Sequence, residues 1–219
     1  MSDWTNNWVE ISGKKDTVVG IKNMLNNEKE NIAFDFNKIM PMPESLDIVE
    51  GSKKIPAIIH YLYKEKGGYM QMFKDKKCQK MLDTVGAAGL VLTDPEYLIN
   101  SHLKYLEYAK YANESLEELY SLGKQYLDNI KNYGFSTWYD WCTHNWGTKW
   151  NACDSNLEAE EEYDDSNYVI RYAFDTAWSA PFGIYEKLHE LYPDVTISVT
   201  YADERDVEEH HLEYGGFTV

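Results

Sequence analysis

The sequence has few cysteines, few basic residues and no long apolar run. Its 219 residues include three cysteines, an odd and widely spaced set that does not suit the disulfide framework of a small secreted domain. Lys and Arg number 21 against 37 Asp and Glu, a formal net charge of −16, which argues against a basic nucleic-acid binder. The most apolar stretch, residues 85–92, is far shorter than the roughly 20 residues of a membrane helix. The N-terminus lacks the basic and apolar regions of a signal peptide, so we expect a cytoplasmic protein that does not enter a membrane.

Motifs for catalysis and cofactor binding are also missing. The chain has no G-x-S-x-G nucleophile elbow and no P-loop. Cys142, His144 and Cys153 come nearest to a metal site, but one residue between Cys142 and His144 is fewer than the usual two or more between paired zinc ligands. We therefore predict a non-enzymatic protein with no cofactor and no bound metal.

Hydrophobic periodicity predicts strands and helices at both ends of the chain. Apolar and polar residues alternate over 8–11, 32–36, 168–175 and 195–201, which is typical of strands. Helical spacing follows the first strand over residues 16–25 and the third over 181–191. Two strand-helix-strand units predict an α+β protein with a ferredoxin-like, split βαβ sheet whose helices cover one face.

The middle of the chain predicts helices, over 55–64, 69–85, 96–111 and 113–133. Ser115 followed by Glu118 resembles a capping box, and Gly134 stands where that helix should stop. We therefore divide the chain into four parts. They are a first βαβ half (1–52), a helical insertion with a tryptophan-rich segment (53–153), an acidic, mobile connector (154–166), and a second βαβ half with a C-terminal tail (167–219).

Three segments resemble a known family. They read FDFNKIMPMPESL from Phe34, WYDWCTHNWGTKWNA from Trp138, and FDTAWSAPFGIYEKLHELYPD from Phe174. Together with the opening TNNWVEISG, they are similar to the phage-associated Api-like family. The resemblance implies a ferredoxin-like domain and an accessory protein of a phage or mobile element in a bacterial cytoplasm, and it implies no catalytic residues. The insertion from about Lys53 to Tyr133 and the tail from Glu204 onward differ from that family, and such regions are where a shared scaffold acquires its own partner.

The leading hypothesis is a binding protein that uses its charge. An acidic surface can occupy a basic groove made for DNA, and opposite charges accelerate the encounter. The expected partner is therefore a host protein, for example a basic nuclease of a defence system, inhibited in the manner of an anti-CRISPR DNA mimic. The expected contact surface is the densest run of acidic residues: Glu158, Glu160, Glu161, Glu162, Asp164 and Asp165. The alternative reading of this run is a solvated linker.

A second hypothesis is a small-molecule or nucleotide binder, such as a sponge for a second messenger. Its ligand site would lie between the sheet and the helical insertion and would use one arginine and several tryptophans: Trp8, Arg171, Trp178, Trp138 and Trp146. The alternative for the tryptophan-rich segment is a buried plug between the insertion and the sheet. Direct nucleic-acid binding is not expected, because the predicted open sheet face carries Glu10, Asp35 and Asp175, whose carboxylates repel phosphates. The sequence does not predict an oligomeric state.

Overall fold

The computed structural model describes residues 3–87, 94–164, 167–204 and 208–215. By its internal contacts the chain forms two units, a sheet unit of residues 1–42 and 142–219 and a helical unit of residues 43–141. In chain order the elements are β1 (Trp4–Gly13), α1 (Lys15–Leu25), α2 (Phe36–Ile39), η1 (Glu44–Leu46), α3 (Lys54–Lys66), α4 (Tyr69–Lys74), α5 (Lys76–Ala87), α6 (Pro95–Ala112), α7 (Leu116–Tyr133), α8 (Trp138–Asn145), β2 (Cys153–Asp164), β3 (Asn167–Ala177), α9 (Phe182–Leu191), β4 (Thr196–Asp203) and β5 (His210–Tyr214).

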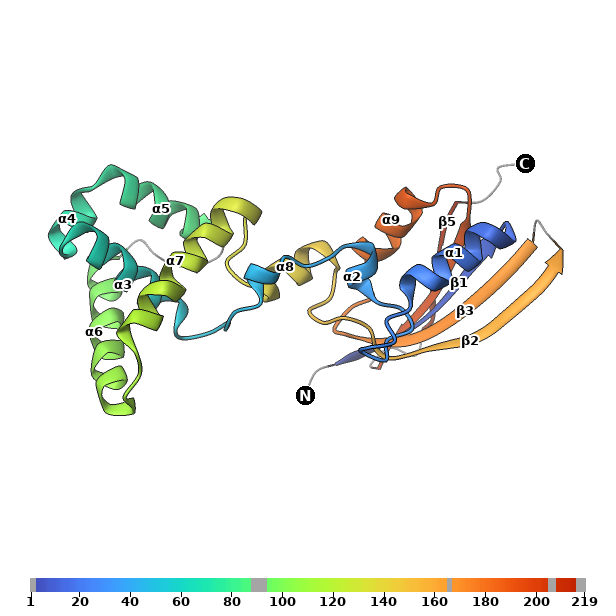
Figure 1. Cartoon of the computed structure of the whole chain (residues 1–219), viewed down its shortest axis with the longest axis horizontal. Coiled ribbons are helices and arrows are strands. Elements are labelled where there is room, and N and C mark those ends of the chain that lie inside the picture. Colours follow the sequence, from blue (N-terminus) through green and yellow to red (C-terminus); the bar gives the residue numbers. More distant parts are fainter. Residues whose placement is uncertain (1–2, 88–93, 165–166, 205–207, 216–219) are drawn as a thin grey trace. The chain divides into compact units, whose positions relative to one another are not determined.

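The sheet unit contains a five-stranded antiparallel sheet in the order β2-β3-β1-β4-β5. Helices α1 and α9 lie against one face of this sheet (Figure 1). Alternation along β1 sets the two faces, since Val9 and Ile11 are buried while Trp8, which precedes Val9, is 40% exposed. The strands predicted over 8–11, 168–175 and 195–201 and the helices predicted over 16–25 and 181–191 are confirmed, with small shifts at their ends.

The strand predicted over residues 32–36 is wrong. The alternating Phe34 and Phe36 are indeed buried, but the segment turns into the short helix α2, in which the Asp35 side chain accepts from the Asn37 N–H as the N-cap. The backbone N–H groups of Phe34 and Phe36 are each bonded at 2.8 Å by side-chain oxygens of Ser155 and Asn151, respectively. Asp35 is consequently 1% exposed and is not on the open sheet face. The buried rings of Phe34 and Phe36, two residues apart, therefore gave the sequence of this turn the alternation that is typical of a strand.

The acidic connector predicted over residues 154–166 is also wrong. Residues up to Asp164 belong to β2, which pairs with β3 at the edge of the sheet. Its side chains are mostly exposed, so the run lacks the buried alternate positions by which a strand is recognised in sequence. Charged side chains on an edge strand also protect it from pairing with another molecule.

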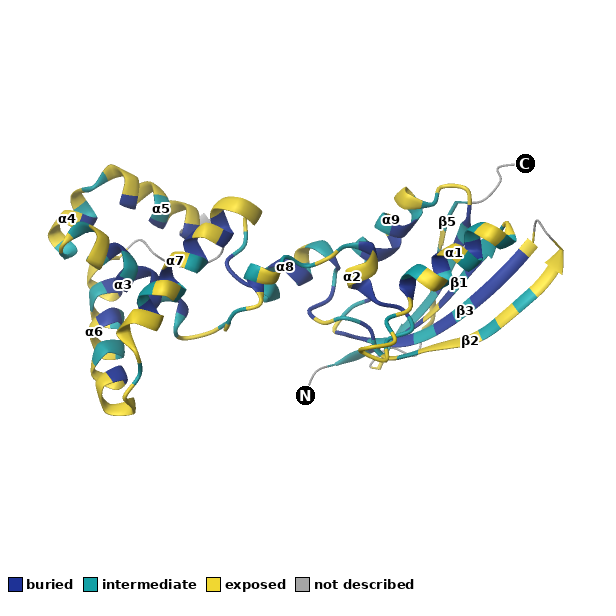
Figure 2. Cartoon of the chain, in the orientation of Figure 1, coloured by how far each residue is buried: buried dark blue, intermediate teal, exposed yellow. Residues whose placement is uncertain are grey.

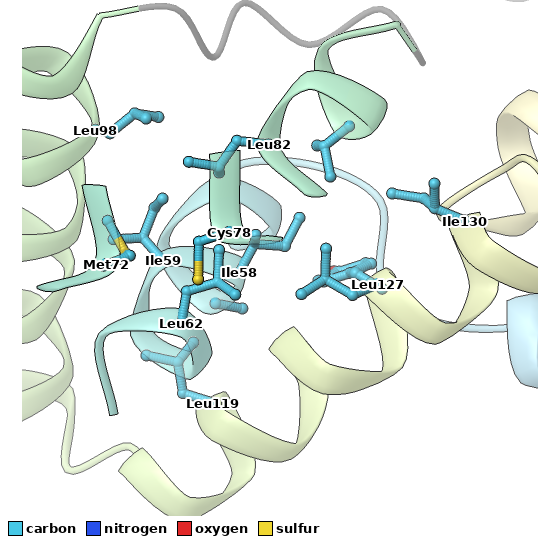
Figure 3. Close-up of a cluster of buried hydrophobic side chains, with 13 residues drawn as sticks. Ile58, Ile59, Leu62, Met72, Cys78, Leu82, Leu98, Leu119, Leu127 and Ile130 are labelled. Atoms are coloured by element: carbon cyan, nitrogen blue, oxygen red, sulfur yellow. The ribbon is translucent and has the colours of Figure 1, made fainter. Parts of the chain in front are cut away.

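The helical unit has its own core, formed chiefly by α3, α5 and α7 (Figure 3). Ile58, Ile59 and Leu127 are among its buried side chains, and Figure 2 shows that α3 and α7 carry both buried and exposed residues. Helices α3 and α7 approach closely at Gly123, where a Cβ would lie 2.0 Å from the carbonyl oxygen of Ala57. The predicted start and stop of the last long helix are confirmed, because Ser115 accepts a hydrogen bond from the Glu118 N–H and Gly134 ends the helix in the left-handed conformation. The helix predicted over 69–85 is two helices, α4 and α5, separated at Asp75.

A hydrogen-bonded pair of histidines is buried in the helical unit. His60 Nδ1 lies 2.9 Å from His102 Nε2, and the Tyr69 hydroxyl lies 2.7 Å from His102 Nδ1. His102 is completely buried. Burial, with the neighbouring His60, lowers the pKa of His102 to about 4, and burial also lowers the pKa of His60. Both rings are therefore neutral at pH 7.

Candidate functional site

The face of the sheet opposite α1 and α9 is accessible and polar. Glu10 on β1 stands between Arg171 of β3 and Ser198 of β4, and Ser198 pairs with Glu213 of β5. Side chains directly opposite each other in an antiparallel pair lie on the same face. Glu10 and its partners thus form one row of side chains across the sheet. A neighbouring row runs from Ala173 through Trp8 and Thr200 to His211. We call this surface the open face, and its residues are Asn6, Trp8, Glu10, Arg171, Ala173, Asp175, Ser198, Thr200, His211 and Glu213.

A shallow hollow of about 240 Å³ lies on the open face and is lined in part by Trp8, Glu10, Glu158 and Arg171. Glu158 reaches it because the pairing of β2 with β3 shifts by one residue between Leu157 and Ala159. Such a β-bulge redirects the side chain of the extra residue. The structure therefore brings together one residue of the predicted acidic run and two residues of the predicted ligand site.

Arg171 bonds to two carboxylates. Its Nε donates to Glu10 at 2.7 Å and its Nη1 to Glu161 at 2.9 Å. These bonds raise the pKa of the Arg171 guanidinium above its ordinary value. Glu161 also accepts from the Tyr163 hydroxyl, and the bonds from Tyr163 and Arg171 lower its pKa. Arg171 thus holds the carboxylates of Glu10 and Glu161 in place beside it.

Glu160 and Glu162 of the run do not share this surface. Glu160 pairs with Lys22 of α1 at 2.6 Å and Glu162 pairs with Lys15 at 2.5 Å, so both side chains lie on the side of the sheet that carries α1. The bonds from Lys22 and Tyr168 lower the pKa of Glu160. Asp164 ends β2, and Asp165 lies outside the described residues. Because successive side chains of a strand point to opposite faces, a continuous acidic run becomes two separate groups.

The predicted tryptophans also separate. Trp146 is 3% exposed, packs its ring against Phe36 and donates its indole N–H to the Met40 carbonyl at 2.9 Å, so it belongs to the core and not to a ligand site. Trp138 contacts the Tyr139 ring in the helical unit. Trp178 follows the end of β3, with Lys149 Nζ 4.1 Å from its ring centre. Trp8 and Arg171 of the predicted ligand site line one hollow together.

The part of the site that sequence reasoning missed comes from the C-terminal tail. β5 adds Glu213 and His211 to the open face, and the His211 ring nitrogen lies 2.9 Å from the Thr200 hydroxyl. In the sequence, β5 is the five-residue stretch HHLEY. Its single aliphatic residue gives too little alternation of apolar and polar residues to predict a strand.

The three cysteines are free thiols. Cys142 is buried, and its thiol contacts the Met42 sulfur at 3.6 Å. Burial raises the pKa of Cys142 to about 12. Within the described ranges, no group of three or more His, Cys, Asp or Glu residues is placed to hold a metal ion, and none of the described helices is long and apolar enough to cross a membrane.

Comparisons with known proteins give one structural neighbour. No protein-family model and no curated protein matches the chain. Among solved structures, the chain is similar to a protein api92 from Yersinia pseudotuberculosis, of family model DUF1281, at 12% sequence identity and a TM-score of 0.42. The match covers 98% of this chain and 95% of that chain. A likeness of this size carries no argument about function.

Proposed function

We propose that the sheet unit binds a basic surface of another protein through its open face, and that the protein acts as a non-enzymatic inhibitor. The observation that carries the proposal is the combination on this face of Trp8, 40% exposed, with the carboxylates of Glu158 and Glu213. Among the described residues, neither carboxylate has a hydrogen-bond or ion-pair partner. An exposed tryptophan surrounded by polar groups is a typical anchor of a protein interface.

The distribution of charge supports the same conclusion. The sheet unit holds 23 of the 37 carboxylates and 9 of the 21 basic residues, a net charge of −14 out of −16. A strongly acidic unit attracts basic partners over distances of about one Debye length, ~8 Å at physiological salt. A DNA-binding groove of a host nuclease has the complementary charge, which is why we propose a partner of this kind.

The alternative of a small ligand in the hollow of the open face has less support. The hollow of about 240 Å³ is below the ~300–1,000 Å³ of ordinary ligand pockets. Arg171, the group that would recognise a phosphate, already bonds to Glu10 and Glu161. A phosphate would have to compete with these carboxylates for Arg171.

We further propose a ferredoxin-like sheet unit with the helical unit inserted in it, in a protein of a phage or mobile element. The strand order β2-β3-β1-β4, with α1 following β1 and α9 between β3 and β4, supports the first part, because it matches a split βαβ arrangement to which β5 is added. The second part rests on the resemblance of the segments beginning at Phe34, Trp138 and Phe174 to the Api-like family.

The test is capture from lysates of bacteria that carry defence systems, followed by elution in a salt gradient and mass spectrometry. Three chains are compared: the wild type, an open-face variant (Trp8→Ser, Glu158→Gln, Glu213→Gln) and a control variant (Leu191→Ser, Glu28→Gln, Glu30→Gln). The control removes the same charge and one apolar side chain that is 47% exposed, at positions away from the open face.

The proposal expects the wild type and the control to retain one basic protein that moderate salt releases. The open-face variant should retain at least about tenfold less, since the loss of a central anchor costs about 2 kcal/mol or more. Equal retention by all three chains, or no specific partner in any lysate, would contradict the proposal.

A further inference from the structure

A groove in the helical unit has the opposite charge from the open face. It lies between α5 and α7 and has a volume of about 550 Å³. Lys77 and Lys80 of α5 line it together with Lys124 and Lys131 of α7, and we call it the lysine groove. Helical spacing explains the arrangement, because residues three, four or seven apart share one side of a helix.

Positive charge in the lysine groove is largely uncompensated. Lys124 pairs with Asp128 at 3.0 Å, and Asp128 is the one carboxylate among the described residues that line the groove. Within the described part of the chain, the ammonium groups of Lys77, Lys80 and Lys131 have no acidic partner. Placing four ammonium groups around one hollow costs free energy through their mutual repulsion, and an anion bound there would relieve it.

The floor of the groove is apolar. Met81, Leu127 and Ile130 form it, with the Tyr61 ring at its side. Leu127 and Ile130 are also part of the buried core of the helical unit (Figure 3), so the floor is held by packing. A rim of ammonium groups over such a floor suits a molecule that has both a polyanionic and an apolar part.

We propose that the lysine groove binds a small phosphorylated ligand of nucleotide size. Its volume of about 550 Å³ lies within the ~300–1,000 Å³ range of ligand pockets. Lysines bind phosphate oxygens as point charges, and the base of a nucleotide would cover Tyr61 and Met81. This site is independent of the open face, which belongs to the other unit.

The size of the groove favours a nucleotide over a nucleic acid or an acidic protein segment. A nucleic-acid strand needs a basic track that continues over several phosphates, whereas the four lysines surround a single hollow. A docked helix would need a longer apolar groove to hold anchors on successive turns.

The experiment is isothermal titration of the full chain with ATP, GTP and cyclic di-GMP. Inorganic triphosphate, adenosine and a polyglutamate peptide serve as comparison probes. A groove variant (Lys80→Glu, Lys131→Glu) is matched by a control variant (Lys104→Glu, Lys110→Glu), whose two exposed lysines lie on α6 and line none of the described hollows. Circular dichroism verifies that both variants fold.

At least one nucleotide should bind the wild type and the control variant and lose at least about tenfold in affinity in the groove variant, a loss of 1.4 kcal/mol. It should also bind more tightly than triphosphate or adenosine, because each of these lacks one half of the recognised chemistry. The proposal is overturned if no nucleotide binds, if the groove and control variants bind equally, or if triphosphate or polyglutamate binds as tightly as the nucleotide.

Discussion

The two units of this protein differ more in charge than in size. The sheet unit carries a net charge of −14, whereas the helical unit has 12 lysines against 14 carboxylates, a net charge of −2. The overall value of −16 therefore describes the sheet unit and conceals a basic groove in the helical unit. A net charge limits the partners of a surface only when the charges are assigned to that surface.

Each unit has buried residues of its own, such as Trp146 in the sheet unit and His102 in the helical unit, which gives ways to perturb one unit at a time. Each unit has its own apolar core. If the two cores are independent, thermal unfolding should show two transitions, and each of the following changes should move only one of them.

The largest effect is expected for Trp146→Ala in the sheet unit. The change removes a buried ring and its hydrogen bond to Met40, so the free energy of unfolding of the sheet unit should fall by about 3–5 kcal/mol. Trp8→Ala, at an exposed position, should change it by less than about 0.5 kcal/mol. Chemical denaturation of both variants measures the difference. Equal losses would mean that Trp8 is a core residue.

The counterpart in the helical unit is Gly123→Ala. The added Cβ would meet the Ala57 carbonyl at 2.0 Å and force α3 and α7 apart, at a cost near the upper end of overpacking, about 3 kcal/mol. Calorimetry should show the transition of the helical unit at a lower temperature and that of the sheet unit unchanged. Gly20→Ala, on α1 with no atom near the added Cβ, serves as the control and should leave both transitions in place.

Acid should weaken the helical unit selectively through the buried histidine pair. The pKa of His102 is about 4 in the folded chain and near 6.5 in the unfolded chain, so the unfolded state takes up the proton first. Stability contributed by the neutral ring is complete above pH 6.5 and is lost as the pH falls toward 4, by up to roughly 3 kcal/mol. Unfolding measured from pH 7 to 4.5 tests this, and His102→Gln should flatten the slope of the helical unit. An unchanged slope in that variant would assign the acid sensitivity to other groups.

The smallest effects separate the two groups within the acidic run. Glu160→Gln and Glu162→Gln each remove a surface ion pair to α1, so each should cost less than about 1 kcal/mol and should leave partner capture unchanged. Glu158→Gln should leave stability unchanged and reduce capture. Weaker capture by the Glu160 and Glu162 variants would extend the contact surface around the edge strand.

Most of the regular structure was predictable because its signals are local. Alternation in β1, β3 and β4 and the capping residues of α7 each lie within a few neighbouring residues. The predictions for the segment around Phe34 and for the edge strand β2 failed because both structures depend on tertiary contacts. The backbone N–H groups of Phe34 and Phe36 donate to the side chains of Ser155 and Asn151, more than a hundred residues away in the chain, and an edge strand exposes both of its sides.

The candidate site was predictable only in fragments. Trp8 and Arg171 were identified from the phase of their strands, and Glu158 from the density of acidic residues. Their convergence depends on the register of four strands and on the bulge before Ala159, neither of which the sequence displays. The lysine groove had no signal at all, since its lysines come from two helices separated by about forty residues.

The most direct test of the open face as a binding surface is site-specific photocrosslinking. A benzophenone amino acid replaces Trp8 in one chain and Leu191 in another, and both are irradiated in bacterial cells that carry defence systems. We expect a single basic protein to be crosslinked from position 8 and not from position 191. Crosslinks from position 191 alone, or the same products from both positions, would contradict the assignment of binding to the open face.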